Sequence, residues 1–255
     1  MPGTPNNGLR RPTEQDTVVD NEDHSLYRSR VGMLLYLVKH SRPNIANATR
    51  ELSKLMDKPT PAAMKELKRV IKFVIDTKDY GLKIEPNVLS TDGKWDLILY
   101  SDSDWAGDKD TRISVSGYIK FLQGVPICWR SKGQKSVTLS SSKAELVALS
   151  EAAKEIKFIA QVLISMGLEV RLPIVCRVDN VGAIFMAKNT STSQRAKHLD
   201  LRYRFLTEFI EEGFIKIIFV KTTENISDTF TKNVSSTIYE AHTKNYITDK
   251  SYLKI

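Results

Sequence analysis

The first part of the chain carries apolar residues at steps of three and four, the spacing of helices with one buried face. One such helix ends before Pro43, because proline disfavours helical backbone in the residue that precedes it. A second helix is predicted over residues 45–57. A third begins after Thr60, a suitable N-cap, with Pro61 at its first position. Residues 86–93 contain Pro, Asn and Gly without periodicity and predict a linker.

From Trp95 onward, short apolar runs separated by turn residues replace the helical spacing. Residues 97–100, 115–122 and 125–130 indicate three strands joined by short connections, and hence an antiparallel meander. A long amphipathic helix is predicted over residues 140–166. The elements after it are a strand over 174–178, a short helix through 187, a helix over about 194–212, a strand over 214–220 and a short helix near 225. Strands followed by strand/helix alternation predict an α/β fold with a mixed sheet.

The patterns also predict how the chain is divided. The expected units are a flexible leader over 1–24, a helical module over 25–88, an α/β domain over 92–232 and a tail over 233–255. The leader is polar and aperiodic. The tail is polar with scattered aromatic residues and receives no assignment.

Composition limits the class of protein. The chain has 255 residues, of which 41% are hydrophobic and 27% charged, as in soluble globular proteins. A net charge of +8 favours a polyanionic partner such as nucleic acid, although a solvated basic surface explains it equally well. Cys128 and Cys176 lie in apolar runs, which excludes a disulfide framework and favours a reducing compartment. No apolar run approaches the ~20 residues that span a bilayer, so no membrane partner is expected.

Two acids stand in apolar surroundings. Asp102 follows a buried strand, where an unpaired carboxylate is costly unless a cation meets it, although a turn-initiating Asp is the common alternative. Asp104 fits that turn role better. Glu145 lies on the core-facing stripe of the long helix, although the helix dipole also favours an acid in the first turn.

Two further acids have an ordinary and a functional interpretation. Asp179 ends a buried strand, where open sheets place ligand-binding groups, although Asp179 or Asn180 could instead cap the next helix. Asp228 is flanked by Ile226 and Phe230, although a solvated helical acid is the commoner case. Together the four acids suggest a cluster drawn from two strands and two helices.

Acids that crowd together without matching bases need cations, and ligands that are all oxygen favour Mg²⁺ or Mn²⁺. Two such ions about 4 Å apart can activate a water and stabilise the leaving oxygen of a phosphodiester. The histidines are not at zinc-ligand spacing, and neither Gly-x-Ser-x-Gly nor the Walker pattern occurs. The sequence therefore disfavours a zinc site, a serine hydrolase and a P-loop NTPase.

Ordered motifs carry a resemblance over about nine-tenths of the chain. In the α/β part they are Tyr100-Ser-Asp-Ser-Asp-Trp-Ala-Gly107, Ser114-Val-Ser-Gly-Tyr118, Ile127-Cys-Trp-Arg-Ser-Lys132, Leu139-Ser-Ser-Ser-Lys-Ala-Glu-Leu-Val-Ala-Leu149, Val178-Asp-Asn180, Lys197-His-Leu-Asp-Leu-Arg-Tyr203 and Ser227-Asp-Thr-Phe-Thr-Lys232. Upstream they are Tyr27-Arg-Ser-Arg-Val-Gly32 and Ser41-Arg-Pro-Asn-Ile45. These motifs resemble the ribonuclease H domain of copia-type retrotransposon Pol polyproteins and the segment that connects it to the polymerase. Departures such as Lys143, where the family usually has an acid or Thr, remove no metal ligand.

The resemblance implies a ribonuclease H-like mixed sheet, with an antiparallel three-stranded meander plus parallel strands, flanked by helices and preceded by a small helical module. It implies that Asp102, Glu145, Asp179 and Asp228 are catalytic acids that bind two Mg²⁺ ions, with Mn²⁺ as a substitute. The expected activity is endonucleolytic cleavage of the RNA strand of an RNA/DNA hybrid, and the polymerase part of a Pol protein is a further expected partner. The polymerase motif Tyr-x-Asp-Asp is absent from the chain, so reverse transcription by this polypeptide alone is not expected.

Basic residues near the acids are candidates for nucleic-acid contacts. Arg130, Lys132 and Lys135 precede the helix that carries the glutamate, with a purely solubilising role as the equal alternative. Lys197 and His198 are expected near the site, although His198 fits a structural helix position as well. Two rival classes remain: an inactive remnant that binds nucleic acid or a Pol partner, and an integrase-like protein, which the motif order and the fourth acid disfavour.

Overall fold

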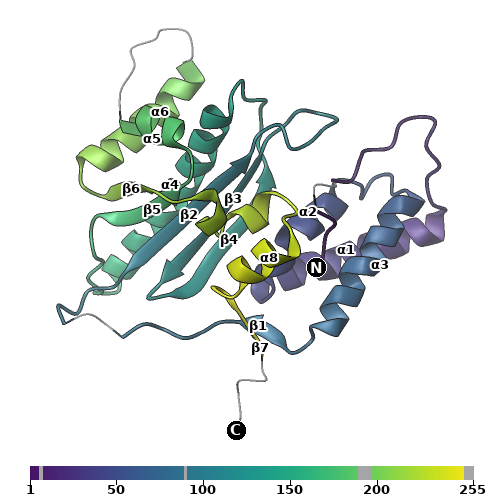
Figure 1. Cartoon of the computed structure of the whole chain (residues 1–255), viewed down its shortest axis with the longest axis horizontal. Coiled ribbons are helices and arrows are strands. Elements are labelled where there is room, and N and C mark those ends of the chain that lie inside the picture. The colour runs from purple at the N-terminus through teal and green to yellow at the C-terminus, as the bar shows by residue number, and fades with distance from the viewer. Residues whose placement is uncertain (6–7, 89–90, 189–196, 250–255) are drawn as a thin grey trace.

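Figure 1 shows the computed structural model of the chain, which describes residues 1–5, 8–88, 91–188 and 197–249. Of residues 197–201 and 203 only the backbone is described. In the described part, no helix is both long and apolar enough to cross a membrane.

A five-stranded mixed sheet with the order β4-β3-β2-β5-β6 forms the centre of the α/β part. Strands β2 (Leu97–Asp104), β3 (Val115–Leu122) and β4 (Val125–Gly133) form the antiparallel meander. Strand β5 (Ile174–Val178) pairs in parallel with β2, and β6 (Ile215–Phe219) pairs in parallel with β5. The predicted ribonuclease H-like sheet is therefore confirmed.

Helices cover the sheet because its strands present apolar side chains on both faces. The long helix α4 (Ser141–Ser165) is capped by the Ser140 side chain, as its predicted start requires. Together with α5 (Val181–Lys188) and α6 (Lys197–Glu211) it closes the larger core. The residues of that core include Leu99, Tyr118, Leu146, Leu149, Ile156, Cys176, Val178, Leu206 and Ile217.

The N-terminal part contains the three predicted helices (Figure 1). They are α1 (Asn21–His40), α2 (Ala46–Ser53), which follows the 3₁₀ turn η1 (Pro43–Ile45), and α3 (Pro61–Asp76). Thr60 caps α3 by accepting a hydrogen bond from the Ala63 amide at 3.2 Å, as predicted. Helix α2 is shorter than the predicted 45–57, because the Lys54 and Leu55 amides bond to carbonyls three residues back rather than four.

The C-terminal segment lies between the sheet and the helical module. After the 3₁₀ turn η2 (Thr222–Glu224) it forms α7 (Asp228–Thr231), α8 (Ser236–Thr243) and β7 (Ile247–Asp249), and β7 pairs with β1 (Tyr80–Leu82). A core separate from those of the sheet and of the helical module joins the three parts through Ala46, Ile119, Phe121, Ile226, Phe230, Tyr246 and Ile247. Residues far apart in the sequence therefore pack together on the face of the sheet opposite α4.

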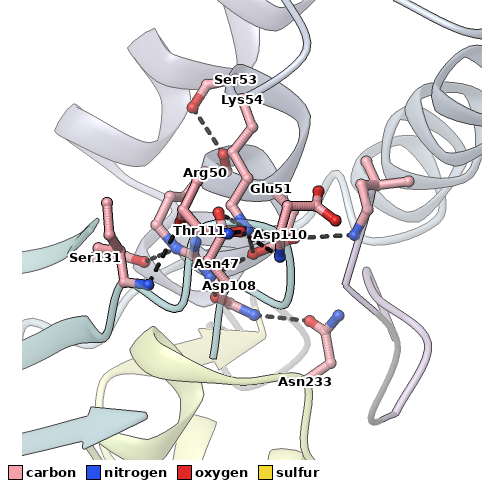
Figure 2. Close-up of polar contacts among 12 residues, drawn as sticks. Asn47, Arg50, Glu51, Ser53, Lys54, Asp108, Asp110, Thr111, Ser131 and Asn233 are labelled. Atoms are coloured by element: carbon pink, nitrogen blue, oxygen red, sulfur yellow. Dashed lines mark hydrogen bonds and ion pairs between the residues drawn. The ribbon is translucent and has the colours of Figure 1, made fainter. Parts of the chain in front are cut away.

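Polar contacts tie α2 to the loop that follows β2 (Figure 2). Lys54 lies 3.3 Å from Asp108 in that loop, and Arg50 donates to the Ser131 hydroxyl of β4 at 3.1 Å. Glu51 accepts a hydrogen bond from the Leu9 amide at 3.0 Å. The helical module therefore contacts the end of the sheet at which β2 presents its acids.

Candidate active site

Strand β2 delivers Asp102 to a buried position, where the residue is 2% exposed. The hydroxyl of Thr231 in α7 donates a hydrogen bond to the Asp102 Oδ2 atom. Asp102 faces Gly117 of β3 in the sheet register. A Cβ atom at Gly117 would lie 2.6 Å from the Thr231 methyl and 2.8 Å from the Phe230 Cβ. Glycine is therefore required for α7 to lie directly on β3.

Glu145 reaches the same place from the first part of α4. It is 5% exposed, which agrees with its predicted position on the core-facing stripe. The Ser103 amide donates to Glu145 Oε1 at 2.9 Å. The other oxygen, Oε2, has no hydrogen-bond partner in the described part of the chain. A buried carboxylate oxygen without a partner is costly, and a cation would remove that cost.

Asp179 follows β5 and is half-buried. The Asn180 side chain accepts a hydrogen bond from the Ala183 amide at 2.9 Å, so Asn180 rather than Asp179 caps α5. The Asn225 amide group donates to Asp179 Oδ1 at 3.3 Å and to the Ser101 carbonyl at 3.1 Å. Asn225 thus links the ends of two parallel strands.

Carboxylate oxygens of Asp102, Glu145 and Asp179 lie within 4.8 Å of one another. The structure thus brings together three of the four acids selected from the sequence, each from a different element. Three oxygen donors at this spacing suit a hard divalent cation such as Mg²⁺.

Asp228 is the first residue of α7 and is 3% exposed, so it is not the solvated helical acid that was its ordinary alternative. The Lys232 Nζ atom lies 3.0 Å from Asp228 Oδ2, while Oδ1 has no hydrogen-bond partner among the described residues. Asp228 is not part of the group of three. Asp228 is therefore a neighbour of the three acids, and the Lys232 ammonium group is its ion-pair partner.

The electrostatics of the cluster follow from burial and like charge. Burial raises the pKa of Asp102, and the charge of Asp179 raises it further. Burial, followed by the charges of Asp102 and Asp179, raises the pKa of Glu145 well above its usual value. Burial and the charge of Asp102 raise the pKa of Asp228 to about 8. The donor set and its unpaired oxygens therefore fit a bound divalent cation.

Asp104 takes the turn role expected of it. It is the last residue of β2, and its carbonyl accepts a hydrogen bond from the Gly107 amide at 3.3 Å. Burial raises the pKa of its carboxyl group, but Asp104 lies outside the group of three acids.

The basic residues predicted to contact nucleic acid differ in exposure and in whether an acid already pairs with them. Arg130 forms an ion pair with Glu155 of α4 at 2.9 Å, which occupies its charge, whereas Lys132 and Lys135 are exposed. Lys197 and His198 are the first residues of α6, and their side chains lie outside the described part of the chain.

Among the described residues, Asn225, Thr231 and Lys232 contact the acids through their side chains, and physical reasoning from the sequence did not predict these contacts. Lys232 could have been found from its spacing, since residues four apart at a helix end lie on one side. Asn225 and Thr231 are neutral polar residues, and no local pattern distinguishes them from ordinary turn and helix-end residues.

No family model matches the chain, but its sequence is similar to retrovirus-related Pol polyproteins from transposons. It is 36% identical over 219 residues to the retrovirus-related Pol polyprotein from transposon RE1 of Arabidopsis thaliana, a match that covers 86% of this chain and 14% of that protein. The chain therefore spans about one seventh of the length of that relative. It is also 43% identical over 129 residues to the secreted RxLR effector protein 161 of Plasmopara viticola, covering 51% of this chain and 87% of that protein.

Among solved structures, the crystal structure of LC11-RNase H1 in complex with an RNA/DNA hybrid is similar over 53% of this chain and 93% of that chain, with 13% sequence identity and a TM-score of 0.40.

Proposed function

We propose that this chain, which belongs to the retrovirus-related Pol polyproteins of copia-type transposons, is a metal-dependent endonuclease that cuts the RNA strand of RNA/DNA hybrids. The observation that carries the proposal is the convergence of Asp102, Glu145 and Asp179 within 4.8 Å. Two buried carboxylate oxygens, Glu145 Oε2 and Asp228 Oδ1, have no hydrogen-bond partner in the described part of the chain, which supports a role in holding cations.

The acids would hold two Mg²⁺ ions, with Asp228 completing the site, and Mn²⁺ would substitute. Bound there, Mg²⁺ would supply the Lewis acid that activates a water and stabilises the leaving oxygen of a phosphodiester. The protein itself orients the carboxylate groups that would bind the metal ions. Thr231 fixes Asp102, the Ser103 amide fixes Glu145, and Asn225 holds Asp179.

The substrate proposal rests on family membership and charge. The net charge of +8 favours a nucleic-acid partner, and exposed Lys132 and Lys135 are proposed to contact its phosphates. Contacts to 2′-hydroxyl groups across the wide minor groove would select the RNA strand. The polymerase part of a Pol protein is the second proposed partner.

The test is cleavage of a labelled RNA/DNA hybrid in Mg²⁺, with RNA duplex and DNA duplex as substrate controls. Asp102→Asn and Glu145→Gln are expected to lower the cleavage rate by about a hundredfold or more, since even residues that only orient metal ligands matter by ~10–100-fold. Glu151→Gln on the same helix is the matched control and should cleave at the parental rate. Equal cleavage by Asp102→Asn and the parent would overturn the proposal, and metal binding without cleavage would favour an inactive remnant.

A further inference from the structure

The Lys232 side chain supplies a positive charge next to the acids. Its Nζ atom lies 3.0 Å from the Asp228 carboxylate, whose side chain is 4% exposed, whereas the Lys232 side chain is 37% exposed. No other Lys or Arg in the described part of the chain forms an ion pair with the four acids. The ammonium group therefore reaches a buried anion from the solvent side.

The influence of Lys232 extends beyond its direct partner. Its charge lowers the pKa of Asp102 and of Asp104, against the effect of burial. Burial lowers the pKa of Lys232, but the acids together raise it above its usual value, with Asp102 the strongest of them, followed by Asp228. His242 of α8 has its pKa lowered by burial first and by the Lys232 charge as well. Lys232 is thus a charged ammonium that partly neutralises the acid cluster.

The backbone holds Lys232 in place while its side chain keeps access to water. The Lys232 amide bonds to the Asp228 carbonyl at 3.1 Å and ends α7, and its backbone is extended there. The Lys232 side chain is 37% exposed, and its flexible stem gives the ammonium group a route to solvent.

The second oxygen of Asp228 gives independent evidence for a ligand. Oδ1 is buried and has no hydrogen-bond partner among the described residues, although Lys232 occupies Oδ2. A single ion pair therefore leaves this carboxylate half satisfied, which points to a second cation.

We propose that Lys232 competes with a divalent metal ion for the Asp228 carboxylate, so that an ion bound at Asp228 must displace the ammonium group. In the described part of the chain no ion pair joins Lys232 to Asp102, Glu145 or Asp179, so at that group the ammonium acts only through its charge and no metal ion has to displace it. This inference rests on the proposed function in one respect only, that the acids bind metal. It gives the protein two classes of divalent site, a stronger one at the group of three and a weaker one at Asp228.

Calorimetric titration of the metal-free protein with Mn²⁺ and Mg²⁺ tests this directly. In Lys232→Gln the weaker site is expected to bind about tenfold more tightly, the change that about 1.4 kcal/mol of ion-pair competition produces, while the affinity of the stronger site rises less. Lys232→Arg keeps the charge and should keep the weak site. Lys216→Gln, an exposed lysine on β6, is the matched control. Equal affinities in Lys232→Gln and the parent would overturn the inference.

A second pair of variants covers the case in which Lys232→Gln folds poorly. Asp228→Asn should lose the weaker site, and the double variant Asp228→Asn, Lys232→Gln should match it, with circular dichroism as the check of folding. A weaker site that persists in Asp228→Asn contradicts the inference. Because these readouts are binding constants, tighter metal binding by Lys232→Gln, together with absence of hybrid cleavage by the parent protein, would support the inference and refute the proposed function. Absence of divalent binding in every variant would refute both.

Discussion

At the scale of single residues, the candidate site stores unfavourable electrostatic energy. Asp102, Glu145 and Asp228 are all buried, and burial is the first cause of the raised pKa of each. A folded protein accepts this cost when the groups serve a function that a well-packed core would not provide. Stability and activity should therefore respond in opposite directions to neutral substitutions at these positions.

Asp102→Asn is expected to stabilise the metal-free protein while it abolishes hybrid cleavage. The amide removes a buried charge that faces Asp179 and keeps a hydrogen bond with Thr231. We expect a gain of about 1 kcal/mol in the free energy of unfolding, the usual size of such gains. Urea unfolding in EDTA measures it, and a loss of stability relative to the parent would contradict this account.

The stability of the metal-free protein should also depend on pH through Asp228. Its pKa is raised from 3.8 to about 8, so the folded state binds the proton more tightly than the unfolded state does. The contribution of this group to stability therefore falls as the pH rises from about 4 to about 8 and is constant above that range. Thermal unfolding in EDTA across this range should show the fall in the parent and a smaller fall in Asp228→Asn.

At the scale of elements, the position of α7 depends on a glycine in the neighbouring strand. Gly117→Ala would place a Cβ at 2.6 Å from the Thr231 methyl, so α7 must move away from β3. We expect a loss of about 1–3 kcal/mol in the free energy of unfolding, together with slower hybrid cleavage, because α7 carries Asp228. Gly133→Ala in β4 is the matched control, since its nearest atom outside the adjacent residues, the Ile113 Cγ2, would lie at 3.9 Å. Equal stability of the two variants would show that α7 does not depend on Gly117.

Much of the secondary structure was predictable because its signals are local. The spacing of apolar residues predicted the three N-terminal helices, the strands of the meander and α4. Glu145, a charged residue on the apolar face of α4, was predicted as a candidate site residue and is buried beside the other acids. Asn225 and Thr231 were not predictable, because their partners Asp179 and Asp102 lie 46 and 129 positions away in sequence. The pairing of β1 with β7 joins Tyr80 to Asp249 and equally leaves no local pattern.

At the scale of the whole molecule, the C-terminal segment connects the helical module to the candidate site. Tyr246 is fully buried, and its hydroxyl lies 2.8 Å from the Thr229 hydroxyl of α7. Its ring packs against Phe230, with the ring centroids 5.6 Å apart. Since Phe230 and Thr229 follow Asp228 directly, the tail supports the helix that positions this acid.

Tyr246→Ala tests whether that support reaches the site. The cavity should cost about 3–5 kcal/mol in the free energy of unfolding, whereas Tyr246→Phe removes only the hydroxyl and should cost about 1 kcal/mol. If the tail positions α7, Tyr246→Ala should also weaken divalent binding at Asp228 under conditions in which the protein is still folded, and Tyr246→Phe should weaken it less. Titration with Mn²⁺, with folding followed by circular dichroism, separates the two effects. A destabilised Tyr246→Ala that keeps the parental metal affinities would restrict the tail to a structural role, because α7 would then hold Asp228 in place without it.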